Sequence, residues 1–533
     1  MRTIISLLLI APLFLAAQNA EKPKLIVGIV VDQMRYDFLY RYSDRYGNNG
    51  FKKLLARGYS CENTHIPYVP TITAPGHTCV YTGSVPALHG IVSNEWYSRQ
   101  QKTEIYCVAD THYRTIGAES KTGQCSPNNL KVTTITDELR LASNFRSKTI
   151  GVALKDRSSI LPAGHIANHA YWYDGKSGHF VSSSYYQEPF PEWVKQFNDQ
   201  HLPEKYLKSN WKTISTTYAE STDDDEPWEG KFANEEKPVF PHKVDELTKK
   251  GYSILTSTPW GNTLTFEMAK AAIANEHLGK GPFTDFLAVS FSSTDHIGHQ
   301  FGPNSIETED CYLRLDSEMG NFLLYLDQAV GAGNYLLFLT ADHGVSHAVG
   351  FSQYHQVPAG HINTSLDSLC NQFLEARFGE KNMVESFSNF QVYLNESKLN
   401  ADGMRRKVTD ALIPFLLQQP GIAKAVELAQ LGNAPMEPQL KERIANGYNQ
   451  QLSGDIQVVY DAAFLEGYPT GTTHSGPYNY DTHIPLVWYG WHIKPGKDFS
   501  ETRMTDIAAT LAALLHIQEP SGCVGRPIAG IFK

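Results

Sequence analysis

Four short runs of mostly apolar residues recur along the chain and predict buried strands. They cover residues 25–31, 149–154, 286–291 and 335–340. A strand with one face in water alternates apolar and polar residues, so continuous runs of this kind are typical of strands buried on both faces, as in a parallel sheet. A fifth run of the same character covers residues 484–489.

Helical patterns lie between these runs, including residues 51–55 and 310–330. Strands that alternate with helices predict an α/β fold, in which a mostly parallel sheet is flanked by helices. Residues about 170–260 and 345–470 interrupt the alternation, and we interpret both stretches as insertions that cap one edge of the sheet. At 533 residues the chain is long for one domain. We therefore expect one large domain over residues 21–533 that carries these insertions.

The first twenty residues have the pattern of a secretory signal peptide. Arg2 precedes an apolar run over residues 4–17, and small residues follow it. That run is short for a membrane span, and we expect no association with a membrane. The sequence thus predicts an exported protein, located in the periplasm or outside the cell. With a net charge of −10, the chain also lacks the basic character of nucleic-acid-binding proteins.

Seven cysteines occur, and in an exported protein cysteines can form disulfides. The local pairs Cys61–Cys79 and Cys107–Cys125 are open possibilities, because spacing alone does not determine connectivity. An odd number leaves at least one cysteine outside any intramolecular pair. No two cysteines have the Cys-x-x-Cys spacing, which argues against a zinc ribbon or a thioredoxin-like site.

Residue types that bind metals gather next to the predicted buried strands. They are Asp32, Asp295, His299, Asp342, His343 and His474. A single Asp after a strand is more often a helix cap, but the carboxyl ends of parallel strands meet at one edge of a sheet. Six such residues at one edge would serve two metal ions. Carboxylate and imidazole ligands without cysteine suit catalytic zinc.

With Asp-x₃-His at 295–299, Asp-His-Gly at 342–344 and a late His474, the chain resembles the alkaline phosphatase superfamily from Asp32 to His474. The resemblance implies two Zn²⁺ ions for each chain. One would be held by Asp295, His299 and His474. The other would be held by Asp32, Asp342 and His343, and the oxygen of the nucleophile would complete that second site.

Thr73 is the predicted nucleophile, because residues 73–77 match the Thr-x-Pro-x-His segment of that superfamily. Pro75 can start a helix, and a helix N-terminus stabilises a bound anion. A metal-bound hydroxyl is also acidified for attack. Thr71 and Thr78 are the competing hydroxyls. The superfamily places an asparagine twenty-one residues after the nucleophile, where this chain has Asn94, whose amide can donate to a phosphoryl oxygen.

Lys155 and Arg157 follow the second buried run, and their charges suit phosphate oxygens. A Lys-x-Arg pair here resembles the PafA-type bacterial alkaline phosphatases, which hydrolyse phosphate monoesters. The diesterase branch has an aromatic residue after the nucleophile, where this chain has Ala74. The resemblance implies a zinc-dependent alkaline phosphatase that acts on small phosphate monoesters through a phosphothreonine intermediate. It also implies a monomer.

Three other functions remain to be compared with this one. The first is a phosphodiesterase or nucleotide pyrophosphatase of the same fold, which would not depend on Lys155 and Arg157. The second is an exported metal- or phosphate-binding protein, which would not need a nucleophile. A sulfatase requires Cys-x-Pro-x-Arg. The segment that begins at Cys125 has asparagine at position 129, and the sulfatase interpretation is therefore disfavoured.

Overall fold

The computed structural model describes residues 21–186, 188–219, 223–467 and 469–532. The predicted signal peptide, residues 1–20, lies outside these ranges. Among the helices that are described, none combines the length and the apolar character needed to cross a bilayer.

A ten-stranded sheet forms the centre of the molecule, in the order β20-β2-β19-β11-β1-β10-β7-β8-β9-β6. Its strands are β1 (Leu25–Val31), β2 (Tyr59–Cys61), β6 (Thr115–Ile116), β7 (Thr149–Ala153), β8 (His169–Asp174), β9 (His179–Ser183), β10 (Asp285–Phe291), β11 (Tyr335–Thr340), β19 (Leu486–Gly490) and β20 (Gly496–Asp498). The central strands β11, β1, β10, β7 and β8 are all parallel. The predicted α/β fold with a mostly parallel sheet is confirmed.

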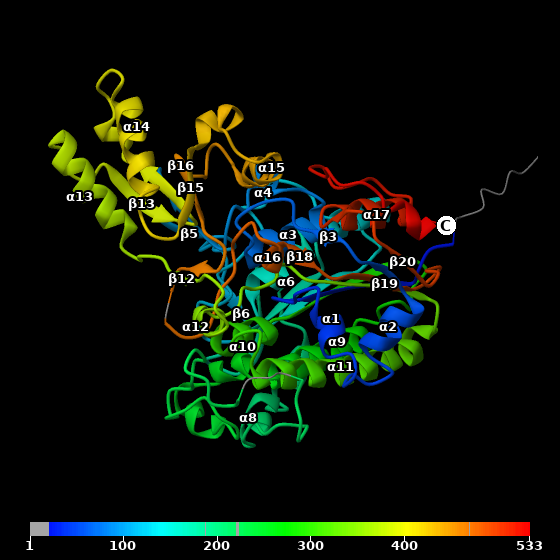
Figure 1. Cartoon of the computed structure of the whole chain (residues 1–533). Coiled ribbons are helices and arrows are strands. Elements are labelled where there is room, and N and C mark those ends of the chain that lie inside the picture. Colours follow the sequence, from blue (N-terminus) through cyan, green and yellow to red (C-terminus); the bar gives the residue numbers. More distant parts are fainter. Residues whose placement is uncertain (1–20, 187, 220–222, 468, 533) are drawn as a thin grey trace, which may run out of the picture.

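Helices cover both faces of this sheet (Figure 1). The α-helices of the described residues are α1 (Phe38–Arg41), α2 (Phe51–Arg57), α3 (Thr73–Thr82), α4 (Pro86–His89), α5 (Ile135–Ala142), α6 (Asp156–Ala163), α7 (Glu192–Asn198), α8 (Leu202–Leu207), α9 (Trp260–Asn275), α10 (Ser293–Phe301), α11 (Ile306–Leu326), α12 (Val349–Tyr354), α13 (Leu366–Phe378), α14 (Met404–Leu416), α15 (Pro438–Gly447), α16 (Asn479–Thr482) and α17 (Asp506–Leu515). Helices α3, α6 and α17 lie on one side, and α9 and α11 on the other.

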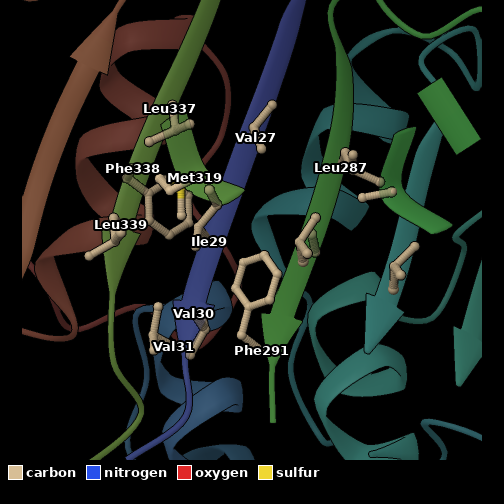
Figure 2. Packing of buried hydrophobic residues seen from close by; sticks show 14 of the residues in the cluster. Val27, Ile29, Val30, Val31, Leu287, Phe291, Met319, Leu337, Phe338 and Leu339 are labelled. Carbon is tan, nitrogen blue, oxygen red and sulfur yellow. The ribbon is translucent and has the colours of Figure 1, made fainter. Parts of the chain in front are cut away.

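The hydrophobic core lies between the sheet and these helices. Figure 2 shows the side chains of β1, β10 and β11 packed together, with Met319 of α11 among them. Every residue of β1 is buried, because both faces of the strand meet helices. Burial of one such aliphatic side chain stabilises the fold by about 1.5–3 kcal/mol, so the core holds the carboxyl ends of these strands in place.

The run at residues 484–489 does not form the single strand that its hydrophobicity predicts. Proline at position 485 has no backbone N–H and interrupts strand pairing. Residues before it form β18 (His483–Ile484), which pairs with β3 (Thr64–His65) outside the central sheet. Residues after it form β19, which is antiparallel to β11. One edge of the central sheet is therefore mixed.

The two predicted insertions are more ordered than their composition suggests. Strands β8 and β9 fall at the start of the 170–260 stretch but belong to the central sheet. The 345–470 stretch contains a second, antiparallel sheet of β13 (Val384–Ser388), β14 (Gln391–Leu394), β16 (Ile456–Tyr460) and β15 (Ile422–Glu427). Together with α13 and α14, this sheet encloses a hydrophobic cluster of its own (Figure 1). We call it the accessory sheet.

Short strand pairs complete the described fold. They are β4 (Glu95–Ser98) with β5 (Thr103–Tyr106), β12 (Gly360–His361) with β17 (Phe464–Leu465), and β21 (Thr502–Arg503) with β3.

All seven cysteines are free thiols, so neither suggested disulfide is present. Cys125 Sγ lies 3.5 Å from the carbonyl oxygen of Thr122 and 3.8 Å from Asp156 Oδ2. Its thiol is thus directed to oxygen atoms rather than to Cys107.

Candidate active site

Three parallel strands bring residues from distant parts of the chain to one edge of the sheet. Asp32 directly follows β1, Asp295 lies in the first turn of α10 after β10, and Asp342 comes two residues after β11. All three carboxylates are at least 95% buried. The expected convergence at the carboxyl edge therefore occurs, and it occurs in a site shielded from water.

The first ligand group combines Asp295, His299 and His474. His299 Nε2 lies 3.2 Å from Asp295 Oδ1, and His474 Nε2 lies 3.8 Å from the same oxygen. The two imidazoles come from segments that are far apart in the sequence. One side chain is on α10, and the other is on the loop that precedes α16. Their ligand atoms all lie within 4.8 Å of one another.

The second ligand group combines Asp32, Asp342 and His343. His343 Nε2 lies 3.5 Å from Asp32 Oδ1 and 3.5 Å from Asp342 Oδ2, and this group also fits within 4.8 Å. The two groups are adjacent, because the rings of His343 and His474 stack with their centroids 3.5 Å apart.

Hydrogen bonds at the Nδ1 atom of each imidazole favour metal binding at Nε2. The Nδ1 atoms of His299, His343 and His474 lie 2.8, 3.0 and 2.6 Å from backbone carbonyl oxygens. A carbonyl only accepts, so each Nδ1 carries the proton and each Nε2 presents a lone pair to the site. Asp32 Oδ1 and Asp342 Oδ2 are buried without a hydrogen-bond partner. Such atoms require a partner, and two divalent cations with nitrogen and oxygen ligands would satisfy them.

The predicted nucleophile, Thr73, is the first residue of α3 and is 2% exposed. Its Oγ1 lies 3.5 Å from His343 Nε2, at the border of the second ligand group. The competing hydroxyls serve local structure instead. Thr78 donates to the carbonyl of Ala74 at 2.7 Å, and Thr71 donates to the carbonyl of Gly476 at 3.2 Å. Thr73 is thus the hydroxyl that the fold directs to the ligand groups.

Asn94 lies next to the nucleophile, because its Oδ1 accepts a hydrogen bond from the backbone N–H of Ala74 at 2.9 Å. This contact orients the side chain so that the amide oxygen faces α3. The amide nitrogen remains the donor for a ligand.

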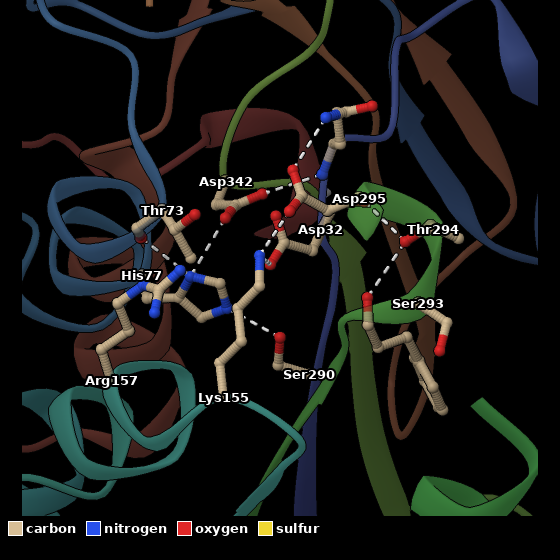
Figure 3. Close-up of polar contacts among 12 residues, drawn as sticks. Asp32, Thr73, His77, Lys155, Arg157, Ser290, Ser293, Thr294, Asp295 and Asp342 are labelled. Atoms are coloured by element: carbon tan, nitrogen blue, oxygen red, sulfur yellow. Dashed lines mark hydrogen bonds and ion pairs between the residues drawn. The ribbon is translucent and has the colours of Figure 1, made fainter. Parts of the chain in front are cut away.

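Lys155 and Arg157 lie at the start of α6 and contribute two cations to the site (Figure 3). Lys155 Nζ lies 2.6 Å from Asp32 Oδ2 and 2.6 Å from Asp295 Oδ2. Arg157 donates to the hydroxyl of Tyr106 at 3.2 Å, while its Nε is buried without a partner. Lys155 therefore joins one carboxyl group from each ligand group, and Arg157 keeps donor capacity for an anion.

Burial and mutual repulsion set the protonation of the carboxylates. Burial, followed by the charges of Asp295 and Asp342, raises the pKa of Asp32 well above its usual range. Burial acts in the same direction on Asp295, but nearby His299 and Lys155 hold its pKa well below the usual range. A dense negative site of this kind binds cations in preference to remaining empty.

Three positioning residues had no role in the sequence-based prediction. Gln33 has a positive φ of 66°, donates through Nε2 to Asp295 at 2.8 Å and through its backbone N–H to Asp342 at 3.2 Å. His77 Nδ1 lies 2.9 Å from the carbonyl of Thr73 and 3.2 Å from Asp342 Oδ2. Only His77 had a detectable signal, since it ends the Thr-x-Pro-x-His segment.

Asp481, the third of these residues, holds two ligand-bearing loops together. Its Oδ2 accepts the backbone N–H groups of Ser475 at 3.1 Å and Gly476 at 2.7 Å, directly after His474. Its backbone carbonyl accepts the N–H of Gly344 at 2.8 Å, directly after His343. No local pattern in the sequence marks this role.

Comparison with known proteins agrees with this geometry. Residues 26–476 match the model of the type I phosphodiesterase / nucleotide pyrophosphatase family. The chain therefore belongs to that family of phosphate-ester hydrolases.

Similar proteins within the family include bacterial alkaline phosphatases. PhoV of Synechococcus elongatus is 47% identical over 97% of this chain and 94% of its own length. PafA of Elizabethkingia meningoseptica is 45% identical over 96% of this chain and 95% of its own length. A protein of Myroides odoratus that is named a calcium-transporting ATPase is 49% identical over 96% of this chain and 95% of its own length.

A crystal structure of PafA superposes with a TM-score of 0.93 at 44% identity, covering 96% of this chain and 99% of that one. A second PafA structure is a variant with four substitutions, Thr to Ser, Asn to Ala, Lys to Ala and Arg to Ala. It superposes equally well. The predicted membership in the PafA-type alkaline phosphatases is confirmed.

Proposed function

We propose that this protein is an alkaline phosphatase that hydrolyses phosphate monoesters by way of a phosphothreonine at Thr73, with two zinc ions. The relatives PhoV and PafA, both named alkaline phosphatases, are 47% and 45% identical over nearly the whole chain and support monoester hydrolysis. The observation that carries the mechanism is the position of the Thr73 hydroxyl, 3.5 Å from His343 and beside two cations at the start of α6.

When bound, the two metal ions supply positive charge that stabilises the oxygens of the phosphoryl group and lowers the pKa of the nucleophile. Asp295, His299 and His474 would hold one ion. Asp32, Asp342 and His343 would hold the other. The identity of the metal as zinc rests on the nitrogen and oxygen donors and on the resemblance to PafA.

Thr73 Oγ1 attacks phosphorus in line with the ester oxygen. The new bond joins Oγ1 to phosphorus, the bond from phosphorus to the leaving oxygen breaks, and the alcohol takes up a proton. The N-terminus of α3 lies at this point and stabilises the negative charge of the phosphothreonine. Water then attacks phosphorus from the opposite side, which releases phosphate and restores the threonine hydroxyl.

Asn94, Lys155 and Arg157 hold the non-bridging oxygens during both transfers. Lys155 and Arg157 also favour a monoester over a diester. A monoester dianion carries one more negative charge than a diester anion, and two fixed cations stabilise that charge. The four residues replaced in the PafA variant are a Thr, an Asn, a Lys and an Arg, which are the four residue types that we assign here.

The same proposal extends to location and assembly. The signal-like segment at residues 1–20 supports export to the periplasm or the medium. We assign residues 21–533 to one catalytic domain, with insertions at about 170–260 and 345–470, and we expect a monomer. Small phosphate esters are the expected substrates, and neither nucleic acid nor membrane is an expected partner.

The test is hydrolysis of p-nitrophenyl phosphate beside bis-p-nitrophenyl phosphate at pH about 8–9, with chelated and zinc-loaded protein. We expect a large preference for the monoester that is lost on chelation and restored by zinc. In a variant with Lys155→Ala and Arg157→Ala, monoester hydrolysis should fall much more than diester hydrolysis. ATP should also be assayed as a substrate, because the Myroides odoratus relative is named an ATPase. A preference for the diester would assign the protein to the phosphodiesterases of this family.

A further inference from the structure

A cavity of about 320 Å³ lies between the accessory sheet and the loop that carries His474. Neither the nucleophile nor Lys155 or Arg157 lines it. Its volume falls in the range of small-molecule sites.

Three segments that position the reacting groups form part of the wall of this cavity. Ile72 comes directly before the nucleophile, and His474 belongs to the first ligand group. Asn389 accepts a hydrogen bond from the hydroxyl of Ser93 at 2.6 Å, directly before Asn94. The cavity therefore adjoins the proposed phosphoryl site, next to the ligand group of Asp295, His299 and His474.

The remaining wall is rich in aromatic side chains. They are Phe390, Tyr460, Phe464, Tyr478 and Tyr480. Phe390 and Tyr460 pack with ring centroids 4.7 Å apart, and Tyr478 and Tyr480 with centroids 5.6 Å apart. The Tyr478 hydroxyl donates to the carbonyl of Tyr460 at 2.6 Å, which links the two pairs. Such fixed rings form a surface on which another ring can stack.

Apart from His474 and the tyrosines, the ionisable side chains of the described wall are carboxylic acids. Asp461, Glu466 and Asp481 line the cavity, whereas no lysine or arginine is among its described lining residues. Burial raises the pKa of Glu466, whose carboxylate accepts the hydroxyl of Tyr460 at 3.2 Å. A leaving group with a second phosphate or a carboxylate would meet repulsion here and no compensating cation.

We propose that this cavity binds the leaving group of the substrate and selects phosphate monoesters of uncharged, ring-bearing alcohols, of which a nucleoside is the representative. The inference rests on the proposed function, because it assumes that the phosphoryl group lies at Thr73. The accessory sheet then has a role in substrate choice, since it supplies Phe390 and Tyr460.

The experiment compares kcat/KM for adenosine 5′-monophosphate and glycerol 3-phosphate, both esters of primary alcohols. We expect the nucleotide to be preferred about tenfold, and Phe390→Ala to lower that ratio about 3- to 10-fold, as expected for one aromatic contact. Phe499→Ala is the matched control, because Phe499 is 73% exposed and does not line the cavity. It should leave the ratio unchanged.

A second variant, at Glu466, tests the charge of the wall. Glu466→Gln should raise kcat/KM for 3-phosphoglycerate relative to glycerol 3-phosphate, because these substrates differ in one carboxylate. Equal rates for nucleotide and glycerol 3-phosphate in the unmodified protein, or a ratio unaffected by Phe390→Ala, would overturn the inference and leave the phosphatase function intact. Failure to hydrolyse any monoester would overturn the proposed function itself.

Discussion

Lys155 offers a sharp test of how the site is balanced electrostatically. Its ammonium group contacts Asp32 and Asp295 at 2.6 Å each, and its side chain is 7% exposed. Burial alone would lower the pKa of Lys155, but the charges of Asp295 and Asp32 raise it above the usual range. The lysine is therefore charged in the metal-free protein, where its single positive charge lies between one carboxyl group from each ligand group.

Lys155→Met keeps most of the side-chain length and removes the charge. In the metal-free protein the substitution leaves the buried carboxylate of Asp295 without its cation, and loss of one partner of a buried ion pair costs about 3–5 kcal/mol. With two divalent ions bound, the metals neutralise the same carboxylate. We therefore expect the loss of stability to be less than half as large in the zinc-loaded protein.

Urea unfolding of chelated and zinc-loaded protein measures the loss of stability in each metal state. Lys53→Met is the matched control. Lys53 pairs with Asp327 at 3.4 Å with both side chains partly exposed, and such a pair is worth about 0–1 kcal/mol. Equal destabilisation by Lys155→Met in the two metal states would refute the reasoning. A loss of stability below about 1 kcal/mol in metal-free Lys155→Met would refute the reasoning as well.

Three further predictions address the nucleophile, a positioning residue and a buried acid. Thr73→Ala should lower kcat for p-nitrophenyl phosphate by roughly 10³-fold or more with unchanged zinc content, and near-normal turnover would exclude Thr73 as nucleophile. Asp481→Ala leaves two backbone donors unpaired, at about 1–3 kcal/mol each. Asp481→Ala should therefore weaken zinc retention. Asp481→Asn keeps an acceptor oxygen and should retain zinc better. Equal zinc retention in the two variants would contradict the positioning role of Asp481. Burial, followed by Glu307, raises the pKa of Glu229 from 4.5 to about 10. Its contribution to stability is therefore full below pH about 4.5 and is lost as pH rises toward 10. Glu229→Gln should stabilise the protein at pH 9 but not at pH 4.5, as measured by urea unfolding, and a difference independent of pH would contradict it.

The parts of the fold that local pattern determines were predictable from the sequence. The runs at 25–31 and 335–340 coincide with β1 and β11, because a strand buried on both faces has to be apolar throughout. The candidate metal-ligand residues were also detectable from the sequence. Parallel strands present their carboxyl ends at one edge, so Asp32, Asp295 and Asp342 had to meet if the strands did.

Other features depend on contacts between residues far apart in the chain, and only the tertiary structure decided them. Proline at position 485 divides an apolar run, and pairing with β11 makes β19 antiparallel. Gln33 and Asp481 position metal-ligand residues through hydrogen bonds to distant loops. Their residue types are common in turns, so neither composition nor spacing distinguishes them.

The sequence by itself determined the class of fold and indicated six candidate ligand residues and a candidate nucleophile, because each of these depends on a short local pattern. The tertiary structure decided how those residues are oriented, which side chains support them and where a leaving group can bind. Hydrogen-bond direction and cavity shape arise only when the accessory sheet, the loop after β11 and the loop of His474 pack together.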